Sequence, residues 1–430
     1  MKLSVVAGAL LFAASSVAAV PMVRPPTFTE GHLAPLYVSN ESETLADNYI
    51  VVLKETADSD KVLDHTAWLT SLILENQDNT LFSEWLHPES MGIRHVYNMP
   101  KLKGYSGRFG KEILEIIRRS DDVAYVEKDS MVYTSELQRG APWGLARISH
   151  RDPLTFRTYN KYEYEADGGK DIKVYVIDTG INVDHVDFEG RATWGETIPA
   201  GDLDEDGNGH GSHCAGTIAG KKYGVAKLAR PVAIKVLRSN GSGTMQDVIK
   251  GVDAATGLHL KDAAAAKKAG KVYKGAVANM SLGGGKSPSL DRAVNGAVEA
   301  GIVFAVAAGN DNSDACNYSP AASELAITVG ASTALDERAY FSNYGPCVDV
   351  FAPGLNIKSI WRGSKTATNT ISGTSMASPH VAGLAAYFLG LSEESVSPQE
   401  VKDKILALAT KNALEKIPSD TPNLLIYNGA

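Results

Sequence analysis

Six short apolar runs beyond residue 170 constrain the fold of this chain more than any other feature of its sequence. Each run is almost continuously apolar, which is typical of a strand that is covered on both faces of a parallel sheet. Stretches with helical character fall between the runs, including 245–270 and 289–300. This alternation predicts an α/β domain with a doubly wound, mostly parallel sheet. The runs are 173–177, 232–237, 276–282, 302–308, 326–330 and 348–352.

The region before residue 135 has a different pattern, and we expect it to form a separate small domain. The chain has 430 residues, more than one typical domain needs, so a large domain with a smaller partner is expected. The order strand, helix, strand, turn, helix, strand predicts a ferredoxin-like α+β domain over 48–134. Residues 20–47, rich in proline, serine and polar residues, are interpreted as a linker. The strand-like and helix-like segments are 48–54, 62–85, 93–97, 111–118 and 123–127.

The first residues have the composition of a secretory signal peptide. Lys2 is positively charged, residues 3–20 are apolar, and residues 17–19 offer a cleavage site, so we predict a signal peptide over 1–19. The alternative is a membrane anchor, but the apolar part is at the short limit for spanning a bilayer. We therefore expect the protein in the secretory pathway, outside the cell or in a vacuolar lumen, with no membrane partner. A net charge of −8 argues against a nucleic-acid partner.

One serine lies between a turn of small residues and an apolar, helix-like run. Residues 373–380 read Gly-Thr-Ser-Met-Ala-Ser-Pro-His, and the apolar run 381–387 follows them. Proline suits the first turn of a helix, so Pro379 is tolerable only if the helix starts just before it. Ser375 is then expected at the helix N-terminus, where free N–H groups and the helix dipole favour negative charge. Taken alone, this serine has the alternative role of a helix cap.

Two further segments place an acid and a histidine in comparable positions. Asp178 follows the apolar run 173–177 and precedes a glycine, so it falls at the carboxyl end of a core strand. His210 lies at a glycine-flanked helix start. Ligand sites of doubly wound sheets lie at the carboxyl ends of the strands. The chain order Asp178, His210, Ser375 is one of the known orders of an Asp-His-Ser triad.

These segments resemble the three signatures of the subtilisin-like serine proteases (peptidase S8 family). The signatures correspond to Asp178–Gly180, His210–His213 and Gly373–Ala377. Three more segments resemble the proteinase K and cerevisin-like fungal branch, namely 141–148, 317–320 and 341–345. The likeness covers about 135–430, the expected peptidase domain, and the domain before it resembles an I9-type inhibitory pro-domain. One residue departs from the pattern, because Ser212 stands where the family has threonine.

The resemblance implies a serine endopeptidase of broad specificity that works through an acyl-enzyme. Ser375 would be the nucleophile, His210 the general base and then acid, and Asp178 the residue that orients the imidazole. By resemblance, Asn310 would donate a hydrogen bond to the oxyanion; its alternative role is that of a turn residue. The resemblance also implies a monomeric zymogen that processes itself and is inhibited by its own pro-domain. Its substrates would be proteins and peptides.

Two glycine-rich segments are expected to shape the substrate cleft. Glycine lets backbones approach closely, which suits an extended peptide bound by strand addition. A cleft built mostly of backbone predicts broad specificity, with a preference for apolar or aromatic residues before the cut. The alternative is that both segments are plain turns. The candidate residues are Gly241, Ser242 and Gly243 in one segment and Ser281, Leu282, Gly283 and Gly284 in the other.

Two of the three cysteines are expected to pair. Cys214 directly follows the histidine motif and is interpreted as a small buried residue. Cys316 and Cys347 remain, in a compartment that permits oxidation, so we predict a disulfide between them. Two unpaired thiols are the alternative.

The chemistry expected of this chain requires no cofactor, but a structural calcium ion is a further possibility. By resemblance to proteinase K, Asp349 would supply a carboxylate to calcium. Glu324 and Ala326 would supply main-chain carbonyls. The family's proline at the position of Glu324 is absent here.

Two other functions fit parts of the pattern. The first is a catalytically silent relative that binds peptides, although the triad residues and Asn310 are all present. The second is a lipase or esterase of the α/β-hydrolase type. That type needs a Gly-x-Ser-x-Gly elbow, whereas Met376 and Ala377 follow Ser375, and its chain order is different.

Overall fold

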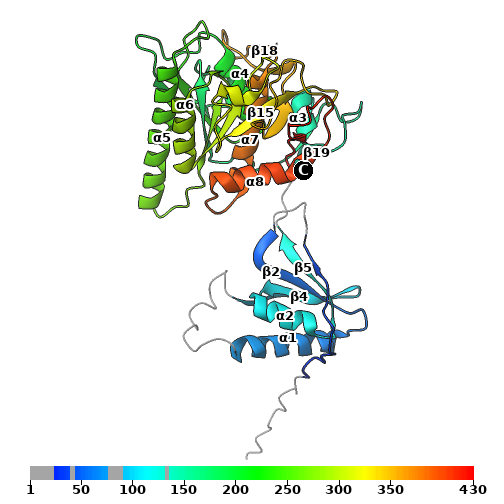
Figure 1. Cartoon of the computed structure of the whole chain (residues 1–430). Helices are drawn as coiled ribbons and strands as arrows, with labels where there is room; N and C mark the ends of the chain where they lie inside the picture. The colour runs from blue at the N-terminus through cyan, green and yellow to red at the C-terminus, as the bar shows by residue number, and fades with distance from the viewer. Residues whose placement is uncertain (1–23, 39–43, 76–90, 131–134) are drawn as a thin grey trace, which may run out of the picture. The chain divides into compact units, whose positions relative to one another are not determined.

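The structure is a computed structural model that describes residues 24–38, 44–75, 91–130 and 135–430 (Figure 1). The predicted signal peptide, residues 1–19, lies outside the described residues. The chain divides into two units, Met1–Val132 and Tyr133–Ala430. Among the described residues, no helix combines the length and the apolar character that crossing a membrane requires.

The described part of the N-terminal unit holds a five-stranded sheet and two helices. Three of the strands and both helices fall where the sequence predicted them, but the strands at 36–37 and 102–108 were not expected. The strand order of the sheet is β1-β5-β2-β4-β3, in which β2 pairs antiparallel with both β4 and β5. Buried side chains from helices and strands, including Leu69, Ile117 and Val126, form its core. The elements are β1 (Leu36–Tyr37), β2 (Thr44–Leu53), α1 (Ser59–Glu75), β3 (Gly92–Met99), β4 (Leu102–Arg108), α2 (Lys111–Arg119) and β5 (Val123–Ser130).

Strand β1 lies inside the segment 20–47, where the composition suggested a linker. It pairs parallel with β5, and Ala34, just before it, is buried in the core of the unit. The Ala34 N–H also donates a hydrogen bond of 2.7 Å to the carbonyl of Arg118 in α2. Packing of this unit therefore begins before residue 48.

The C-terminal unit is built on a nine-stranded sheet in which, among the described strands, only β19 pairs antiparallel. The order is β19-β20-β16-β15-β13-β11-β8-β10-β9, so β8, the first of these strands in the chain, has β10 and β9 on one side and the other six strands on the other. The six apolar runs of the sequence form β8, β10, β11, β13, β15 and β16, as predicted. The strands are β8 (Lys173–Asp178), β9 (Thr193–Thr197), β10 (Arg230–Lys235), β11 (Ala276–Met280), β13 (Ile302–Ala307), β15 (Ile327–Ser332), β16 (Val350–Pro353), β19 (Thr410–Lys411) and β20 (Leu424–Leu425).

Helices cover both faces of this sheet, which explains why its strands are apolar on both sides. In β8, Val174 and Val176 belong to the core beneath α4, α7 and α8, whereas Tyr175 and Ile177 belong to the core beneath α5 and α6. Figure 1 shows α5 and α6 side by side along the sheet. Helix α7 is buried along almost its whole length. The helices are α3 (Trp143–Ile148), α4 (His210–Ala219), α5 (Met245–Lys268), α6 (Pro288–Glu299), α7 (Thr374–Leu391) and α8 (Pro398–Leu408).

Short strand pairs lie beside the main sheet. One of them joins the glycine segment after β11 to the chain that follows β13, because Gly284 and Gly285 pair antiparallel with Ser319 and Tyr318. The pairs are β6 (Ser135–Arg139) with β7 (Lys161–Glu165), β12 (Gly284–Gly285) with β14 (Tyr318–Ser319), and β17 (Ile357–Ile360) with β18 (Thr368–Ile371).

Candidate active site

The last residue of β8 and the first residue of α4 are joined by a hydrogen bond at the carboxyl edge of the sheet. The Asp178 side chain is fully buried, and its Oδ1 and Oδ2 lie 2.8 and 3.0 Å from Nδ1 of His210. Asp178 Oδ1 also accepts a hydrogen bond of 2.7 Å from the Thr179 N–H, so the carboxylate is held in one orientation. The His210 side chain keeps 25% of its surface exposed, which leaves the ring accessible to a substrate.

Two glycines allow α4 to begin where it does. Gly209 has a φ of 107°, in the left-handed region that favours glycine, and a Cβ there would lie 2.5 Å from the Trp361 ring. A Cβ on Gly211 would lie 2.2 Å from the carbonyl oxygen of Gly180. Gly211 therefore lets the helix start pack directly against the turn that follows β8, and Gly209 leaves room for the Trp361 ring.

Asp206 is a functional candidate that the sequence reasoning missed. Its Oδ1 accepts hydrogen bonds from the Thr179 hydroxyl at 2.9 Å and from the N–H groups of residues 208–209 at 3.0 and 2.7 Å. Its Oδ2 accepts from the N–H and the hydroxyl of Ser212 at 2.9 and 2.6 Å. This almost buried carboxylate thus ties the start of α4 to the end of β8. An acid in a glycine-rich turn just before His210 was the signal that could have revealed it.

The charges around His210 raise the pKa of its imidazole above the usual 6.5. Burial, the largest single effect, lowers this pKa, but the charge and hydrogen bond of Asp178 and the charge of Asp206 together outweigh it. The bond to Asp178 also fixes the proton of the neutral ring on Nδ1, which leaves Nε2 free to accept a proton. The ring is therefore arranged as a general base.

Ser375 is the second residue of α7, as expected for a serine at a helix N-terminus. Its hydroxyl donates to the carbonyl oxygen of Ser281 at 3.0 Å. In the described part of the chain, no hydrogen bond joins Ser375 to His210. The starts of α4 and α7 are nonetheless in contact, because the thiol of Cys214, one turn after His210, lies 3.4 Å from the Ser375 carbonyl oxygen.

Pro379 lies further inside the helix than its sequence suggested, because α7 begins at Thr374. Proline has no N–H, so the carbonyl of Ser375, four residues earlier, loses its helical partner. The Ser281 hydroxyl donates to that carbonyl at 2.8 Å instead, and Cys214 approaches it as well. Ser281 and Ser375 are thereby joined reciprocally, each hydroxyl to the carbonyl of the other, and the helix continues through the proline.

Asn310 follows β13 with its side-chain amide fixed by the start of α7. Its Oδ1 accepts hydrogen bonds from the N–H and the hydroxyl of Thr374 at 2.8 and 3.0 Å. The Thr374 hydroxyl is in turn held by the Gly309 N–H at 3.1 Å. With Thr374 bound to the carbonyl end of the amide, the Nδ2 group is left to donate to another partner. Asn310 lines the same cavity as Ser375.

Two neighbouring cavities share a wall made of the segment 282–284. The first, of about 450 Å³, is lined by His210, by 241–245 and by 281–284. All seven residues predicted for the substrate cleft lie on its wall. The second, of about 300 Å³, is lined by Asn310 and Ser375. The structure thus brings the predicted residues of the cleft and of the triad to one region of the surface.

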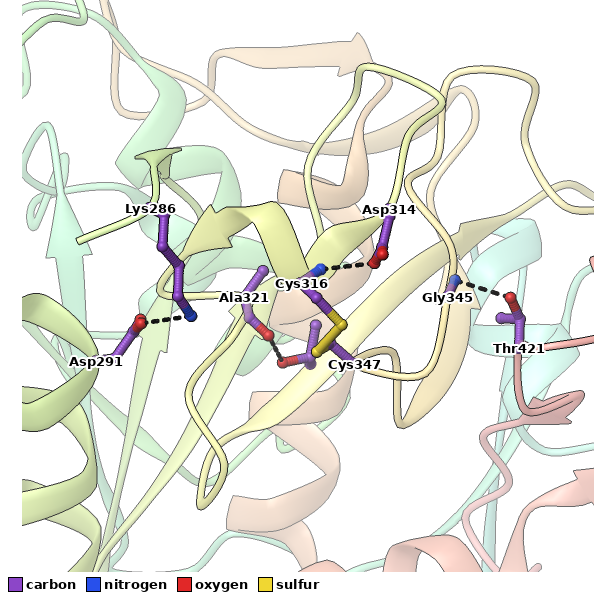
Figure 2. The surroundings of a disulfide bond; sticks show 9 residues. Lys286, Asp291, Asp314, Cys316, Ala321, Gly345, Cys347 and Thr421 are labelled. Carbon is purple, nitrogen blue, oxygen red and sulfur yellow. Dashed lines mark hydrogen bonds and ion pairs between the residues drawn. A yellow bond between two sulfur atoms is a disulfide. The ribbon is translucent and has the colours of Figure 1, made fainter. Parts of the chain in front are cut away.

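A disulfide joins Cys316 and Cys347, as predicted (Figure 2). The chain just after Cys316 lines the second cavity. Cys316 lies in a short 3-10 helix, η3 (Ala315–Asn317). The Asp314 side chain caps the start of this helix, because its Oδ1 accepts a hydrogen bond of 2.9 Å from the Cys316 N–H. Strand β14 follows directly and lines the cavity. The third cysteine, Cys214, is free and buried.

The three residues suggested for calcium also come together, at a different edge of the sheet. The Asp349 carboxylate and the carbonyls of Glu324 and Ala326 surround the ammonium group of Lys402. Lys402, on α8, was not anticipated from the sequence.

Comparisons with known proteins agree with this arrangement. A family model described as the subtilase family matches residues 169–421, and one described as peptidase inhibitor I9 matches residues 48–135. A subtilisin-like protease of Coccidioides posadasii is 58% identical, over 92% of this chain and 83% of the relative. The subtilisin-like serine protease Pen c 2 of Penicillium citrinum is 56% identical, over 92% of this chain and 91% of the relative.

A solved structure extends the likeness to the fold. The cold-adapted subtilisin-like serine proteinase is 44% identical, with a TM-score of 0.60 over 67% of this chain and 98% of that chain. The predicted subtilisin-like α/β fold and the predicted type of pro-domain are thereby confirmed. Subtilases in general need no cofactor, and calcium is optional in them. The chain therefore belongs to the subtilase family, as a subtilisin-like serine endopeptidase made as a zymogen with an I9-type pro-domain.

Proposed function

We propose that Ser375, His210 and Asp178 form the catalytic triad of this endopeptidase. The observation that carries the proposal is the hydrogen bond of 2.8 Å between the buried Asp178 carboxylate and Nδ1 of His210. It lies at the carboxyl edge of the sheet, beside the helix start that presents Ser375. For reaction, the Ser375 hydroxyl must exchange its hydrogen bond with the Ser281 carbonyl for one with Nε2 of His210, by rotation about its Cα–Cβ bond.

The proton moves through His210 in each half of the reaction. As Ser375 Oγ attacks the carbonyl carbon, His210 accepts the hydroxyl proton and then gives it to the leaving amine, so the C–N bond breaks. The product of this half is an ester on Ser375. Water then loses a proton to the same ring and attacks the ester, and the ring returns that proton to Oγ. The Asp178 carboxylate accepts the hydrogen bond from Nδ1 throughout and stabilises the imidazolium.

We further propose that Asn310 and the backbone N–H of Ser375 bind the oxyanion of the tetrahedral intermediate. Two donors on Oδ1 orient the Asn310 amide so that Nδ2 is available. The Ser375 N–H belongs to the first turn of a long helix, where backbone N–H groups are unpaired and the dipole favours negative charge. Donors that are already oriented stabilise the oxyanion without reorganisation during the reaction.

The lining of the larger cavity supports broad specificity with an apolar preference. Leu237, Met245, Val248 and Leu290 contribute apolar side chains to it, and residues 241–243 contribute mostly backbone. All of its lining residues lie in the described part of the chain, and none of them carries a carboxylate. We therefore propose that a peptide binds in extended form and places an apolar or aromatic residue here.

We propose that the domain over 48–134 inhibits the peptidase domain over 135–430 until the chain is cut near residue 135. The I9 match supports the inhibitory role. In this proposal residues 1–19 direct the chain to the secretory pathway, 20–47 precede the inhibitor, and the mature enzyme is a monomer outside the cell or in a vacuolar lumen. The disulfide supports an oxidising compartment.

The experiment that tests self-processing compares purified wild type with Ser375→Ala by N-terminal sequencing and mass. Wild type should begin near residue 135, and Ser375→Ala should keep its pro-domain. Ser392→Ala, at the far end of the same helix, is the matched control and should process normally. If the folded wild type also stays full length, self-processing by Ser375 is wrong. If Ser375→Ala is cut like wild type, another nucleophile or another protease does the cutting.

A further inference from the structure

Lys402 places its ammonium group where a bound cation would lie between three oxygen atoms. Its Nζ is 2.7 Å from the carbonyl oxygen of Ala326, 3.5 Å from that of Glu324 and 2.9 Å from Oδ1 of Asp349. The Lys402 and Asp349 side chains are only 13% and 24% exposed. The ion pair is therefore largely shielded from solvent and from salt.

The fold places this group of residues away from the catalytic edge of the sheet. Ala326 directly precedes β15 and Asp349 directly precedes β16, so both lie at the amino ends of strands. The triad lies at the carboxyl ends. A change at Lys402 can therefore alter the stability of the peptidase unit without touching the catalytic residues.

Helix α8, which carries Lys402, is fixed both at its start and along its buried face. A capping box between Ser397 and Glu400 fixes the start of the helix. Val401 and Ile405, on either side of Lys402 in the sequence, are buried in the main core. The ammonium is thus delivered by a well-anchored helix rather than by a side chain on a free surface.

The oxygen atoms match an ammonium group better than they match calcium. Calcium takes about six to eight oxygen ligands, whereas three oxygens face Lys402 Nζ. The other oxygen of the carboxylate, Asp349 Oδ2, already accepts a hydrogen bond of 2.8 Å from the Thr328 N–H. A lysine ammonium has three N–H donors, one for each oxygen around it. Calcium and the Lys402 ammonium cannot occupy this point together.

We propose that Lys402 is a built-in cation that takes the place of a structural calcium ion in this chain. A bound ion stabilises a protein only as far as its free concentration exceeds its dissociation constant. An ammonium carried by the chain is present at any calcium concentration and cannot be removed by a chelator. The β15 and β16 region of this protease is therefore held together without calcium.

The test measures the midpoint of thermal unfolding, Tm, of inhibitor-blocked enzyme in EDTA and in calcium chloride. Wild type should show the same Tm in both. Lys402→Ser leaves Asp349 without its partner and opens space for an ion, so its Tm in EDTA should fall by roughly 5–10 °C. Calcium should restore part of that loss, and calorimetry should show calcium binding that wild type lacks. Lys261→Ser, on the exposed face of α5, is the control and should behave like wild type.

Two results would overturn the proposal. One is a wild-type Tm that rises with calcium and loses this response in Asp349→Asn, because calcium would then displace Lys402. The other is a Lys402→Ser variant whose Tm in EDTA equals that of wild type. If Lys402→Ser does not fold in either condition, Lys402→Met and Lys402→Met/Asp349→Asn decide the matter. The double variant should have a higher Tm than Lys402→Met, since the neutral side chain at position 349 needs no ionic partner. A Tm equal to or lower than that of Lys402→Met would refute the proposal.

Discussion

Replacing Asn310 by alanine removes one proposed donor to the oxyanion and leaves the triad in place. The oxyanion exists only in the transition state and the intermediate, so the loss should appear in kcat while KM stays almost unchanged. Losing one such donor costs roughly 2.7–4 kcal/mol of transition-state stabilisation, which is a fall of about 100- to 1000-fold in kcat.

The structure also predicts how this loss couples to Thr374. Its hydroxyl orients the Asn310 amide, but its backbone N–H donates to the same oxygen at 2.8 Å and remains in any variant. Thr374→Val should therefore weaken the orientation by one neutral hydrogen bond, about 1 kcal/mol, and lower kcat by about 5-fold. In an Asn310→Ala background the valine should have little further effect, since the amide that it orients is gone.

The assay is steady-state hydrolysis of a chromogenic peptide by the two single variants, the double variant and wild type. The concentration of active enzyme is measured with an irreversible serine-directed inhibitor, so that unprocessed enzyme does not lower the apparent kcat. A fall in kcat of less than about 10-fold in Asn310→Ala would refute the oxyanion role. Equal effects of Thr374→Val in both backgrounds would show that the hydroxyl does not act through Asn310.

Two further predictions concern pH and the disulfide. Because His210 must be neutral to accept a proton and its pKa is raised, kcat/KM should fall as pH drops through a value above 6.5; removing one of the raising charges, in Asp206→Asn, should move this midpoint to lower pH. A midpoint that stays or rises in a pH series from 5 to 9 would contradict the assigned electrostatics. The double variant Cys316→Ser/Cys347→Ser opens a loop of 31 residues, so it should lose about 3–4 kcal/mol of stability. Calorimetry of inhibitor-blocked protein checks this, and an unchanged Tm would show that the bond contributes nothing.

Six strands of the peptidase unit could be predicted because almost every residue in them is buried, on both faces of the sheet. That burial requires an apolar side chain at nearly every position, as in Val174 to Ile177, and such a run is visible in a single sequence. The first strand of the N-terminal unit could not be predicted. Strand β1 has two residues, and its place in the sheet depends on β5, far along the chain.

The candidate site was predictable where a residue lies next to a strand end or a helix start. Asp178, His210, Asn310 and Ser375 all have such positions, and glycines mark the turns around them. Contacts that depend on distant segments could not be predicted. Lys402 lies 76 residues from Ala326 in the sequence, and no local pattern shows which lysine of an amphipathic helix will meet that carbonyl.

Pro379 is another case in which a contact with a distant segment could not be predicted. The rule that proline belongs in the first turn of a helix assumes that the carbonyl four residues earlier finds no other hydrogen-bond donor. Here Ser281, from the segment after β11, supplies one. The exception depends on tertiary packing, which the residues around Pro379 do not encode.

The order of the proposed catalytic residues along the chain has a consequence for the cell that makes this protease. Asp178 and His210 emerge from the ribosome early, but Ser375 comes near the C-terminal end, at the start of a helix that lies buried in the middle of the unit. A partly made chain can hold an acid and a base without a nucleophile. Parallel sheets also form slowly, because their strands pair over long loops. If the proposed triad is right, a chain cannot cut peptide bonds before Ser375 has been made and packed, whatever the state of its inhibitor.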